Sequence, residues 1–478
     1  MAISPVETLF AIGAIDDSAL FASLFAPTAL QDVFDAVFAS STSKGTDRRN
    51  GFQFLKPSSV EFPVVSVKCM AGQYRFAPFL EVLKTKDRKK PPRLIGIPTI
   101  RDRVVLHQLN RFLAATHPER VPKSIASTYV RQIAADLQTK SVGDVWVCST
   151  DIKTFYDSIQ QDRLLKVLGS RINCWQALRL IHHALRTPTV PMNTRRRSHA
   201  DFRSEKGVPQ GLSISNILAS IYMQDIDVPM KKMGVTYYRY VDDVLIYGEK
   251  NAINKAFASL RARLRRRGLS LHKIGSGKTH LAPLSKTFGY LGYTFRWPEI
   301  TVRDSTIERF LQSIAAKFSD YVHNRERRLA KFAYLTEARV AEIFLSELNE
   351  RITGAINQKR RYGWIAYFNQ ITDLTLLHRL DQTIAGMFVR LVDFHGKAPD
   401  ELKRLSRAYF EMKFNSNGGY VRNYDKIVTR AQKLKFLIER GRVGPTEALT
   451  DDQINSRYET YVQHILAAMH ADEGVAYG

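Results

Sequence analysis

The chain has 478 residues, of which 44% are hydrophobic and 24% are charged. This composition excludes a disordered or low-complexity protein, and the length allows about three domains. Lys and Arg together number 71 against 46 Asp and Glu, which gives a formal net charge of +25. So large an excess on a folded chain indicates a polyanionic partner, either nucleic acid or an anionic membrane.

The cysteines and the N-terminal segment indicate a reducing compartment. The cysteines number only three, and Cys69, Cys148 and Cys174 lie too far apart for a CxxC-type zinc site or a disulfide framework. The first residues lack a basic leader, and Asp16 and Asp17 interrupt their apolar stretch. Because no apolar run approaches the roughly 18 residues of a membrane span, we expect a cytoplasmic protein without a membrane partner.

Taken in chain order, the front half mixes helices and strands. Residues 1–60 are predicted to be helical, and residues 61–100 combine β-type runs (Val60–Met70 and Arg93–Ile100) with a basic segment. β-branched and aromatic residues then predict strands at Val145–Ser149, Val235–Tyr240 and Val244–Tyr247. Helical patterns lie between and after them, at Arg163–Leu168, Trp175–Leu185, Ile214–Gln224 and Asn254–Arg267, with Gly268 as a stop signal.

The back half is predicted to be α-helical. Residues 305–395 are almost wholly helical in pattern, and the remainder is helical with a turn at Ser416–Gly419. We find no fixed-period repeat and no long Gly/Ser linker.

Two short acidic segments carry the chemical signal. Asp151 ends the predicted strand before it, and Asp242 and Asp243 lie between two strand-like runs, where a tight hairpin would bring both near one point. Carboxylates brought close together resist ionisation unless a cation compensates them, and Mg²⁺ prefers such oxygen ligands. Two such ions could stabilise the attacking and leaving oxygens of a nucleotidyl transfer. Taken alone, Asp242 and Asp243 could equally form an ordinary turn.

An ordered set of motifs resembles the reverse transcriptase family, in its bacterial branch of group II intron, retron and phage-defence enzymes. The motifs are PRLIGIPTIRDRVV (92–105), STDIKTFYDSI (149–159), GVPQGLSISNILASIYM (207–223), YVDD (240–243), GLSLHKIGSGKTHL (268–281), FGYLGYTF (288–295) and GWIAYF (363–368). The resemblance is strong from about residue 92 to 296, weaker to about 390, and absent beyond.

The resemblance implies an α/β (α+β) right-hand polymerase. Its fingers and palm would be built with a small antiparallel sheet, and its thumb and C-terminal extension would be α-helical. The expected divisions are a helical N-terminal extension (1–60), fingers and palm (61–300), a helical thumb (301–395) and a helical extension of unknown role (396–478).

Residue roles also follow from the resemblance. Asp151, Asp242 and Asp243 would be catalytic and, together with Ile152, would form the site of two Mg²⁺ ions, for which Mn²⁺ could substitute. The expected nucleotide-binding residues are Arg93, Phe155, Tyr156, Gln210, Gly211 and Lys278. Tyr156 would act as the steric gate that excludes a 2′-hydroxyl. The alternative is a core aromatic residue, an interpretation that suits Phe155 better than Tyr156. Lys273 is the alternative to Lys278 as the lysine that contacts the leaving phosphates. Leu291, Gly292 and Tyr293 would form the primer grip.

The implied function is RNA-directed DNA synthesis from dNTPs. The expected partners are an RNA template or noncoding RNA and the DNA product, in a bacterial anti-phage defence system. A retron or group II intron-derived enzyme, an RNA-templated RNA polymerase and a catalytically dispensable RNA-binding scaffold are the alternatives. A homo-oligomer or a second defence protein is left open.

Overall fold

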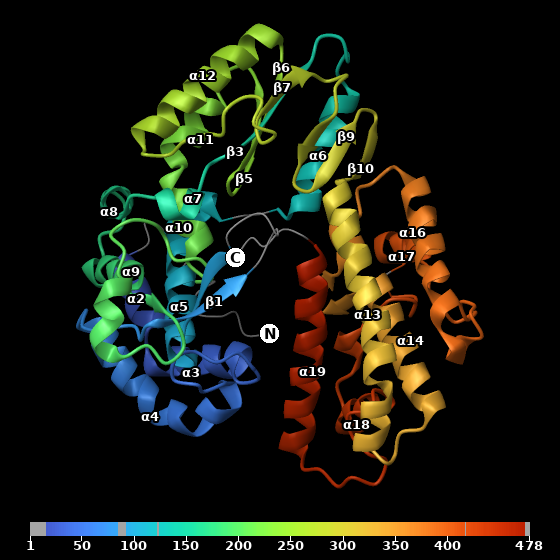
Figure 1. Ribbon diagram of the computed structural model, residues 1–478. Helices are drawn as coiled ribbons and strands as arrows, with labels where there is room; N and C mark the ends of the chain where they lie inside the picture. Colours follow the sequence, from blue (N-terminus) through green and yellow to red (C-terminus); the bar gives the residue numbers. More distant parts are fainter. Residues whose placement is uncertain (1–15, 85–91, 122–123, 416, 474–478) are drawn as a thin grey trace. The chain divides into compact units, whose positions relative to one another are not determined.

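The computed structural model describes residues 16–84, 92–121, 124–415 and 417–473. The chain divides into two compact units (Figure 1). The first unit contains the described parts of Met1–Lys123 and Trp146–Leu281, and the second those of Ser124–Val145 and Ala282–Ala476. This grouping does not follow the four predicted divisions, whose boundaries remain a prediction.

The first unit is a helical assembly with two small sheets. Its helices are α2 (Asp17–Leu24), α3 (Pro27–Val33), the π-helix η1 (Phe34–Phe38), α4 (Gly51–Met70), α5 (Ile100–Thr116), η2 (Pro118–Arg120), α7 (Phe155–Ser158), α8 (Gln161–Gly169), α9 (Trp175–Arg186), η3 (Arg196–Phe202), α10 (Ser215–Tyr222), α11 (Gln224–Met230) and α12 (Lys250–Arg266). Its strands are β1 (Phe79–Lys84), β2 (Arg93–Ile97), β3 (Trp146–Asp151), β4 (Thr189–Val190), β5 (Thr236–Tyr240), β6 (Asp243–Gly248) and β7 (His280–Pro283), the last of which ends just beyond the boundary. The sheets have the strand orders β2-β1-β4 and β5-β6-β3-β7.

The second unit is largely helical. It contains α6 (Ala126–Gln138), α13 (Asp304–Lys331), α14 (Glu337–Thr353), α15 (Trp364–Tyr367), α16 (Leu374–Gly386), η4 (Met387–Arg390), η5 (Val392–Phe394), α17 (Leu405–Phe414), η6 (Tyr424–Lys426), α18 (Arg430–Glu439) and α19 (Asp451–Asp472). Two small sheets join them, with orders β10-β9-β8 and β12-β11-β13, formed by β8 (Phe288–Tyr290), β9 (Tyr293–Arg296), β10 (Glu299–Val302), β11 (Ala355–Asn357), β12 (Arg360–Tyr362) and β13 (Arg422–Asn423).

The expected fold class is confirmed. The first unit combines helices with the small antiparallel β5-β6-β3 sheet, and most of the back half of the chain is helical. The three strands predicted around the acidic segments are all present, as β3, β5 and β6.

One sequence prediction is wrong, and a second has a local exception. Val60–Met70, predicted as a β-type run, belongs to α4, whose buried residues Phe54, Phe62, Val65 and Cys69 recur at helical spacing. A capping box at Asn50 starts this helix, and burial of that face outweighs the strand preference of its valines. The almost wholly helical pattern of 305–395 is interrupted by the β11–β12 hairpin.

No single helix within the described residues is long and apolar enough to cross a bilayer, and only the bent pair Asp17–Leu24 and Pro27–Phe38 meets the criterion jointly, with a 61° bend. The apolar side chains of that pair, among them Phe21, Phe25 and Phe34, are buried in the core of the first unit.

Candidate active site

The acidic hairpin is built by β5 and β6. Tyr240 pairs with Asp243, so Val241 and Asp242 form the turn between the strands. Val241 has a φ of 56°, a left-handed conformation that a β-branched residue rarely adopts. Because such strain persists only where the surroundings enforce it, the turn must be held from outside.

Arg239 and Asp227 provide this support. The Arg239 guanidinium donates to the backbone oxygen of Val241 at 2.8 Å and forms an ion pair with Asp227 at 2.5 Å. Asp227 is buried and also accepts a hydrogen bond from the Tyr237 hydroxyl at 2.9 Å. Sequence reasoning missed this pair; the only signal was an arginine two residues before the turn.

The first acidic segment lies beside the hairpin. β3 pairs antiparallel with β6 in a register that places Asp151 opposite Asp243. The amide of Ile152 donates to the backbone oxygen of Asp242 at 3.1 Å. Asp151, Asp242 and Asp243 are therefore neighbours at one end of the sheet, as predicted, although ninety residues lie between Asp151 and Asp242 in the sequence.

The electrostatics of the site reflect this crowding. Burial raises the pKa of Asp242 well above its usual range, and the negative charges of Asp243 and Asp151 raise it further. The positive charge of Arg93 acts in the opposite direction on the same pKa. Arg93 opens β2, so a basic side chain of the small sheet lies within electrostatic range of the carboxylates.

Two basic side chains approach Asp151. Lys278 Nζ forms an ion pair with Asp151 Oδ2, and His272 Nε2 lies 3.7 Å from the same oxygen. Among the described residues, no group of three or more His, Cys, Asp or Glu is arranged closely enough to hold a metal ion. Oxygen donors from three neighbouring aspartates suit a divalent cation by their chemistry, although their side chains do not converge closely enough in this structure to hold one. Ile152 could add only a main-chain oxygen.

Tyr156 and Phe155 differ in their surroundings. Phe155 is 3% exposed and belongs to the hydrophobic core of the first unit, so its side chain is a packing residue. Tyr156 is half-buried, and its hydroxyl donates to Asn216 Oδ1. Asp242 is among the charges that act on the Tyr156 hydroxyl, which places the Tyr156 ring near the acidic hairpin.

Gln210 and Gly211 lie against strand β2. The amide of Gly96 donates to the Gln210 backbone oxygen at 2.8 Å, and Gln210 Nε2 lies 3.4 Å from Asp157 Oδ1. Gly211 has a φ of 98°, and a Cβ at this position would lie 2.7 Å from the Gly96 oxygen. Only glycine therefore fits between these segments.

The expected primer-grip residues lie in the second unit, at the turn between β8 and β9. Leu291 and Gly292 both have positive φ values, and Tyr290 pairs with Tyr293 across the turn. The side chains of Leu291 and Tyr293 are buried, and the Tyr293 hydroxyl donates to the Tyr367 backbone oxygen at 2.6 Å. Tyr367 belongs to the GWIAYF segment, which thus packs on this turn.

Comparison with known proteins adds an independent observation. Residues 83–295 match the family model described as reverse transcriptase (RNA-dependent DNA polymerase). These residues form a reverse transcriptase domain. All three aspartates and the nucleotide-site and primer-grip candidates fall within this reverse transcriptase domain.

The curated relatives resemble only part of the chain. An uncharacterized 91 kDa protein in a cob intron of Schizosaccharomyces pombe is 30% identical over 36% of this chain and 22% of its own length. Protein YkfC of Escherichia coli is 24% identical over 38% of this chain and 49% of its own. The group II intron-encoded protein LtrA of Lactococcus lactis is 24% identical over 42% and 32%. The chain therefore spans less than half of each relative it matches.

Solved structures of low similarity include a telomerase. The apo telomerase of Candida tropicalis aligns with a TM-score of 0.39 and 13% identity, over 48% of this chain and 55% of that one.

Proposed function

We propose that the protein is an RNA-directed DNA polymerase that extends a 3′ hydroxyl with dNTPs by two-metal-ion nucleotidyl transfer. The observation that carries this proposal is the pairing of Asp151 with Asp243, beside the Asp242 turn, inside a reverse transcriptase domain. A carboxylate cluster of this kind is costly for folding, and its natural use is to hold cations.

In this proposal Asp151, Asp242 and Asp243 hold Mg²⁺ together with the main chain at Ile152. When bound, the ions supply charge neutralisation at the attacking and leaving oxygens. The hairpin keeps Asp242 and Asp243 in place through the Arg239 contact to Val241. Lys278 forms an ion pair with Asp151, so its ammonium group lies at the site and would exchange this partner for phosphate oxygens of a bound nucleotide.

The nucleotide would be held by residues around the hairpin. Arg93 would bind the triphosphate, because its guanidinium matches phosphate oxygens and its charge already reaches Asp242. Tyr156 would lie under the sugar and exclude a 2′-hydroxyl. Gln210 and Gly211 would face the incoming nucleotide and template base, with Phe155 supporting them from the core. The proposed primer grip remains the turn formed by Leu291, Gly292 and Tyr293. Because the side chains of Leu291 and Tyr293 are buried, the turn would contact the primer through its main chain.

A catalytically dispensable RNA-binding scaffold is the second candidate. The contact of Lys278 with Asp151 favours it, since a lysine that permanently neutralises this carboxylate would leave little need for a cation. The presence of all three aspartates argues for the enzyme.

Primer extension on an RNA template tests the proposal. With wild-type protein, Mg²⁺ and dNTPs we expect extension, and with rNTPs very little; efficient rNTP use would indicate an RNA polymerase. Asp242→Asn should lower the rate at least about 100-fold, because the carboxylates contribute several kcal/mol through the ions. The control is Asp201→Asn, which removes an exposed carboxylate of the same domain and should leave the rate unchanged. Full activity of Asp242→Asn would refute the mechanism.

For the biological setting we propose a cytoplasmic component of a bacterial anti-phage defence system that works with a noncoding RNA. The support is the family resemblance, and a retron or group II intron-derived enzyme is the alternative. Sequencing of the nucleic acid that copurifies with the protein would identify the template. Plaque assays should show protection by the wild type and none by Asp242→Asn; equal protection by both would favour the scaffold.

A further inference from the structure

A cavity in the second unit contains none of the proposed active-site residues. It has a volume of about 420 Å³ and is lined by α6, the turn between β9 and β10, the segment between α15 and α16, and α17. All of these elements belong to the second unit. The cavity, called the α6–α17 cavity below, is therefore complete within one unit.

Hydrogen bonds hold the inner wall of the α6–α17 cavity in place. The amide of Thr372 donates to the Ile300 backbone oxygen at 2.8 Å, and the amide of Ile300 donates to Thr372 Oγ1 at 2.8 Å. The Tyr409 hydroxyl donates to the Ile371 backbone oxygen at 2.9 Å. Ile300, Ile371 and Tyr409 are buried, so this wall is formed before any ligand binds.

Two exposed phenylalanines of α17 line the same cavity. Phe410 is 48% exposed and Phe414 is 74% exposed. Their ring centroids lie 6.5 Å apart, and the planes of the two rings differ by 21°. The half-buried Trp297 and the exposed Leu374 add apolar surface. Exposed apolar side chains that gather at one cavity are typical of a binding site.

The charged side chains that line the α6–α17 cavity are Arg131 and Lys413, and both are exposed. Neither forms an ion pair within the described residues. Lys413 Nζ donates to the Tyr409 hydroxyl at 3.1 Å and lies 5.5 Å from the centroid of the Phe414 ring. The carboxylates that are near in sequence have other partners: Asp136 pairs with Lys140, Glu299 with Arg296, Glu411 with Arg407, and Asp373 accepts from the Thr301 hydroxyl.

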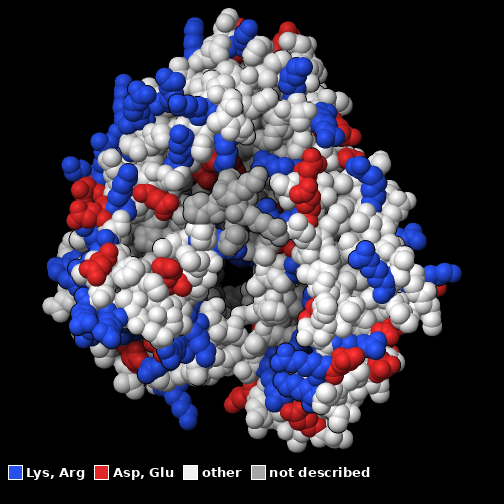
Figure 2. Space-filling model, in the orientation of Figure 1, with Lys and Arg blue, Asp and Glu red and all other residues white. Residues whose placement is uncertain are grey.

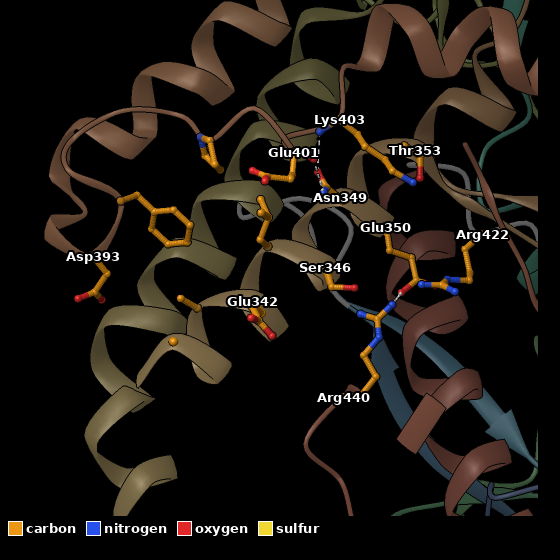
Figure 3. A pocket seen from close by; sticks show the side chains of 15 residues that line it. Glu342, Ser346, Asn349, Glu350, Thr353, Asp393, Glu401, Lys403, Arg422 and Arg440 are labelled. Carbon is orange, nitrogen blue, oxygen red and sulfur yellow. Dashed lines mark hydrogen bonds and ion pairs between the residues drawn. The ribbon is translucent and has the colours of Figure 1, made fainter. Parts of the chain in front are cut away.

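This charge pattern is not shared by the cavity of about 640 Å³ beside α14. Figure 3 shows side chains of both signs on that cavity, where Glu342, Glu350 and Glu401 accompany the basic residues. Glu350 already pairs with Arg440 at 2.6 Å. The lining of that cavity therefore selects neither an anion nor a cation, whereas the α6–α17 cavity presents only positive charge.

Exposed rings beside basic side chains match a single-stranded nucleic acid, whose bases stack on aromatic faces while its phosphates contact the cations. We propose that the α6–α17 cavity binds a single-stranded segment of RNA, with bases on Phe410 and Phe414 and phosphates on Arg131 and Lys413. RNA suits the cavity better than the DNA product, because a template is unpaired before it is copied whereas the product is paired with it. A second copy of the chain is a poorer occupant, since each copy has a net charge of +25. The inference rests on the RNA partner of the proposed function but not on catalysis.

Photocrosslinking tests the proposal directly. The probe is an oligouridine of about twelve nucleotides that contains 5-bromouridine, which crosslinks to aromatic side chains in contact with it. The full chain is used in EDTA and without dNTPs, so that no synthesis is needed. We expect crosslinks on the peptides that contain Phe410 or Phe414. At subsaturating RNA, the double variant Arg131→Gln/Lys413→Gln should lower their yield about tenfold, because it keeps the rings but removes two charge-assisted contacts. The control Lys435→Gln removes an exposed charge of α18 outside the cavity and should leave the yield unchanged.

A second variant tests the stacking. Fluorescence anisotropy should show that Phe410→Ala/Phe414→Ala lowers the affinity for the same oligouridine about tenfold or more, since each stacked base contributes to binding. The control is Val392→Ala, which removes an apolar side chain that is 87% exposed in the same unit and outside the cavity. It should bind RNA as the wild type does. Circular dichroism melting checks that each variant is folded.

Four results would overturn the inference. Crosslinks that avoid the peptides of Phe410 and Phe414 would remove the site. An abasic oligomer that binds as tightly as the oligouridine would eliminate the base contacts. Oligodeoxythymidine that binds more tightly, with the same dependence on the two phenylalanines, would assign the cavity to DNA. A dimer that dissociates in Phe410→Ala/Phe414→Ala would assign it to a second copy. Primer extension by a chain that gives none of these crosslinks would refute the RNA cavity alone and leave the polymerase proposal standing.

Discussion

The hydroxyl of Tyr156 shows how a single residue depends on a partner from another helix. Its acceptor is Asn216, near the start of α10. The contact needs a side-chain oxygen at position 216, which an apolar residue there would not supply. If Tyr156 is the sugar gate, Asn216 sets the orientation of its ring.

Substitution of Asn216 by Leu tests this dependence. The change preserves the approximate size but leaves the half-buried Tyr156 hydroxyl without that acceptor, which costs about 1 kcal/mol. We expect the preference for dNTPs over rNTPs in primer extension to fall about tenfold. Tyr156→Phe removes the hydroxyl instead, and Asn216→Leu should have little further effect on selectivity in that background. Unchanged selectivity in the Asn216→Leu single variant would contradict the positioning role.

Gly211 provides a second test at the same scale. Gly211→Ala would force a Cβ to within 2.7 Å of the Gly96 oxygen at a φ of 98°, so Gln210 or β2 must move. We expect the KM for dNTPs to rise about tenfold or more, since displacement of a positioning contact has effects of this order or larger. Ser213→Ala, in the same loop, serves as the control.

At the scale of elements, the contact between α13, α14 and α19 depends on one buried carboxylate. Glu347 of α14 pairs with Lys317 of α13 at 3.0 Å and accepts from the Tyr461 hydroxyl of α19 at 2.7 Å. Burial alone would raise the pKa of Glu347, but Lys317 and Tyr461 outweigh it and lower that pKa to about 2. The ionised carboxylate therefore stabilises the three-helix contact.

The sign of this pKa shift predicts a pH dependence. Because the folded-state pKa lies below the usual 4.5, the stabilisation is complete above pH 4.5 and is lost as the pH falls toward 2. Glu347→Gln should lower the free energy of unfolding by about 2 kcal/mol at pH 7, and the difference from wild type should shrink between pH 4.5 and 2. Urea unfolding at pH 7, 4.5 and 3 measures it. A difference that stays constant from pH 7 to pH 3 would show that folding does not lower the pKa of Glu347.

The elements also show what sequence can and cannot predict. The strands around the acidic segments were predictable because β-branched and aromatic residues alternate there, and the Asp242 turn followed from its flanking runs. Helix α4 was not predictable from its residue types, because its valines favour strands. Only the burial of Phe54, Phe62 and Val65 selects the helix. The Asp227–Arg239 and Tyr156–Asn216 contacts join separate elements, and no local pattern reports such pairs.

At the scale of the whole molecule, the excess of positive charge is unevenly placed. Figure 2 shows Lys and Arg gathered over α12, where Arg261, Arg265 and Arg266 are exposed. This helix carries the RARLRRR run. Exposed arginines along one helix suit a phosphate backbone, although a solvated helix face has the same appearance.

Salt dependence distinguishes these two interpretations. The affinity for an RNA–DNA duplex should fall by about 10³-fold or more between 50 and 200 mM salt if six or more phosphates are neutralised. Replacing Arg261, Arg265 and Arg266 by Gln should reduce the slope of log affinity against log salt by up to about 3, since each contact contributes about 0.9. Fluorescence anisotropy measures both. An unchanged slope would assign the α12 arginines to the solvated face.

The path of the chain has a consequence for its dissection. Helix α6 belongs to the second unit although it precedes β3, so the backbone passes between the units near residues 123, 145 and 281. A gene cut after residue 281 would leave the apolar side chains of α6, among them Val130, Ile133 and Leu137, without the segments that cover them. Neither unit can therefore be produced as one uninterrupted fragment. For the same reason, a recombination event that replaces only one end of the gene would not exchange one complete unit for another.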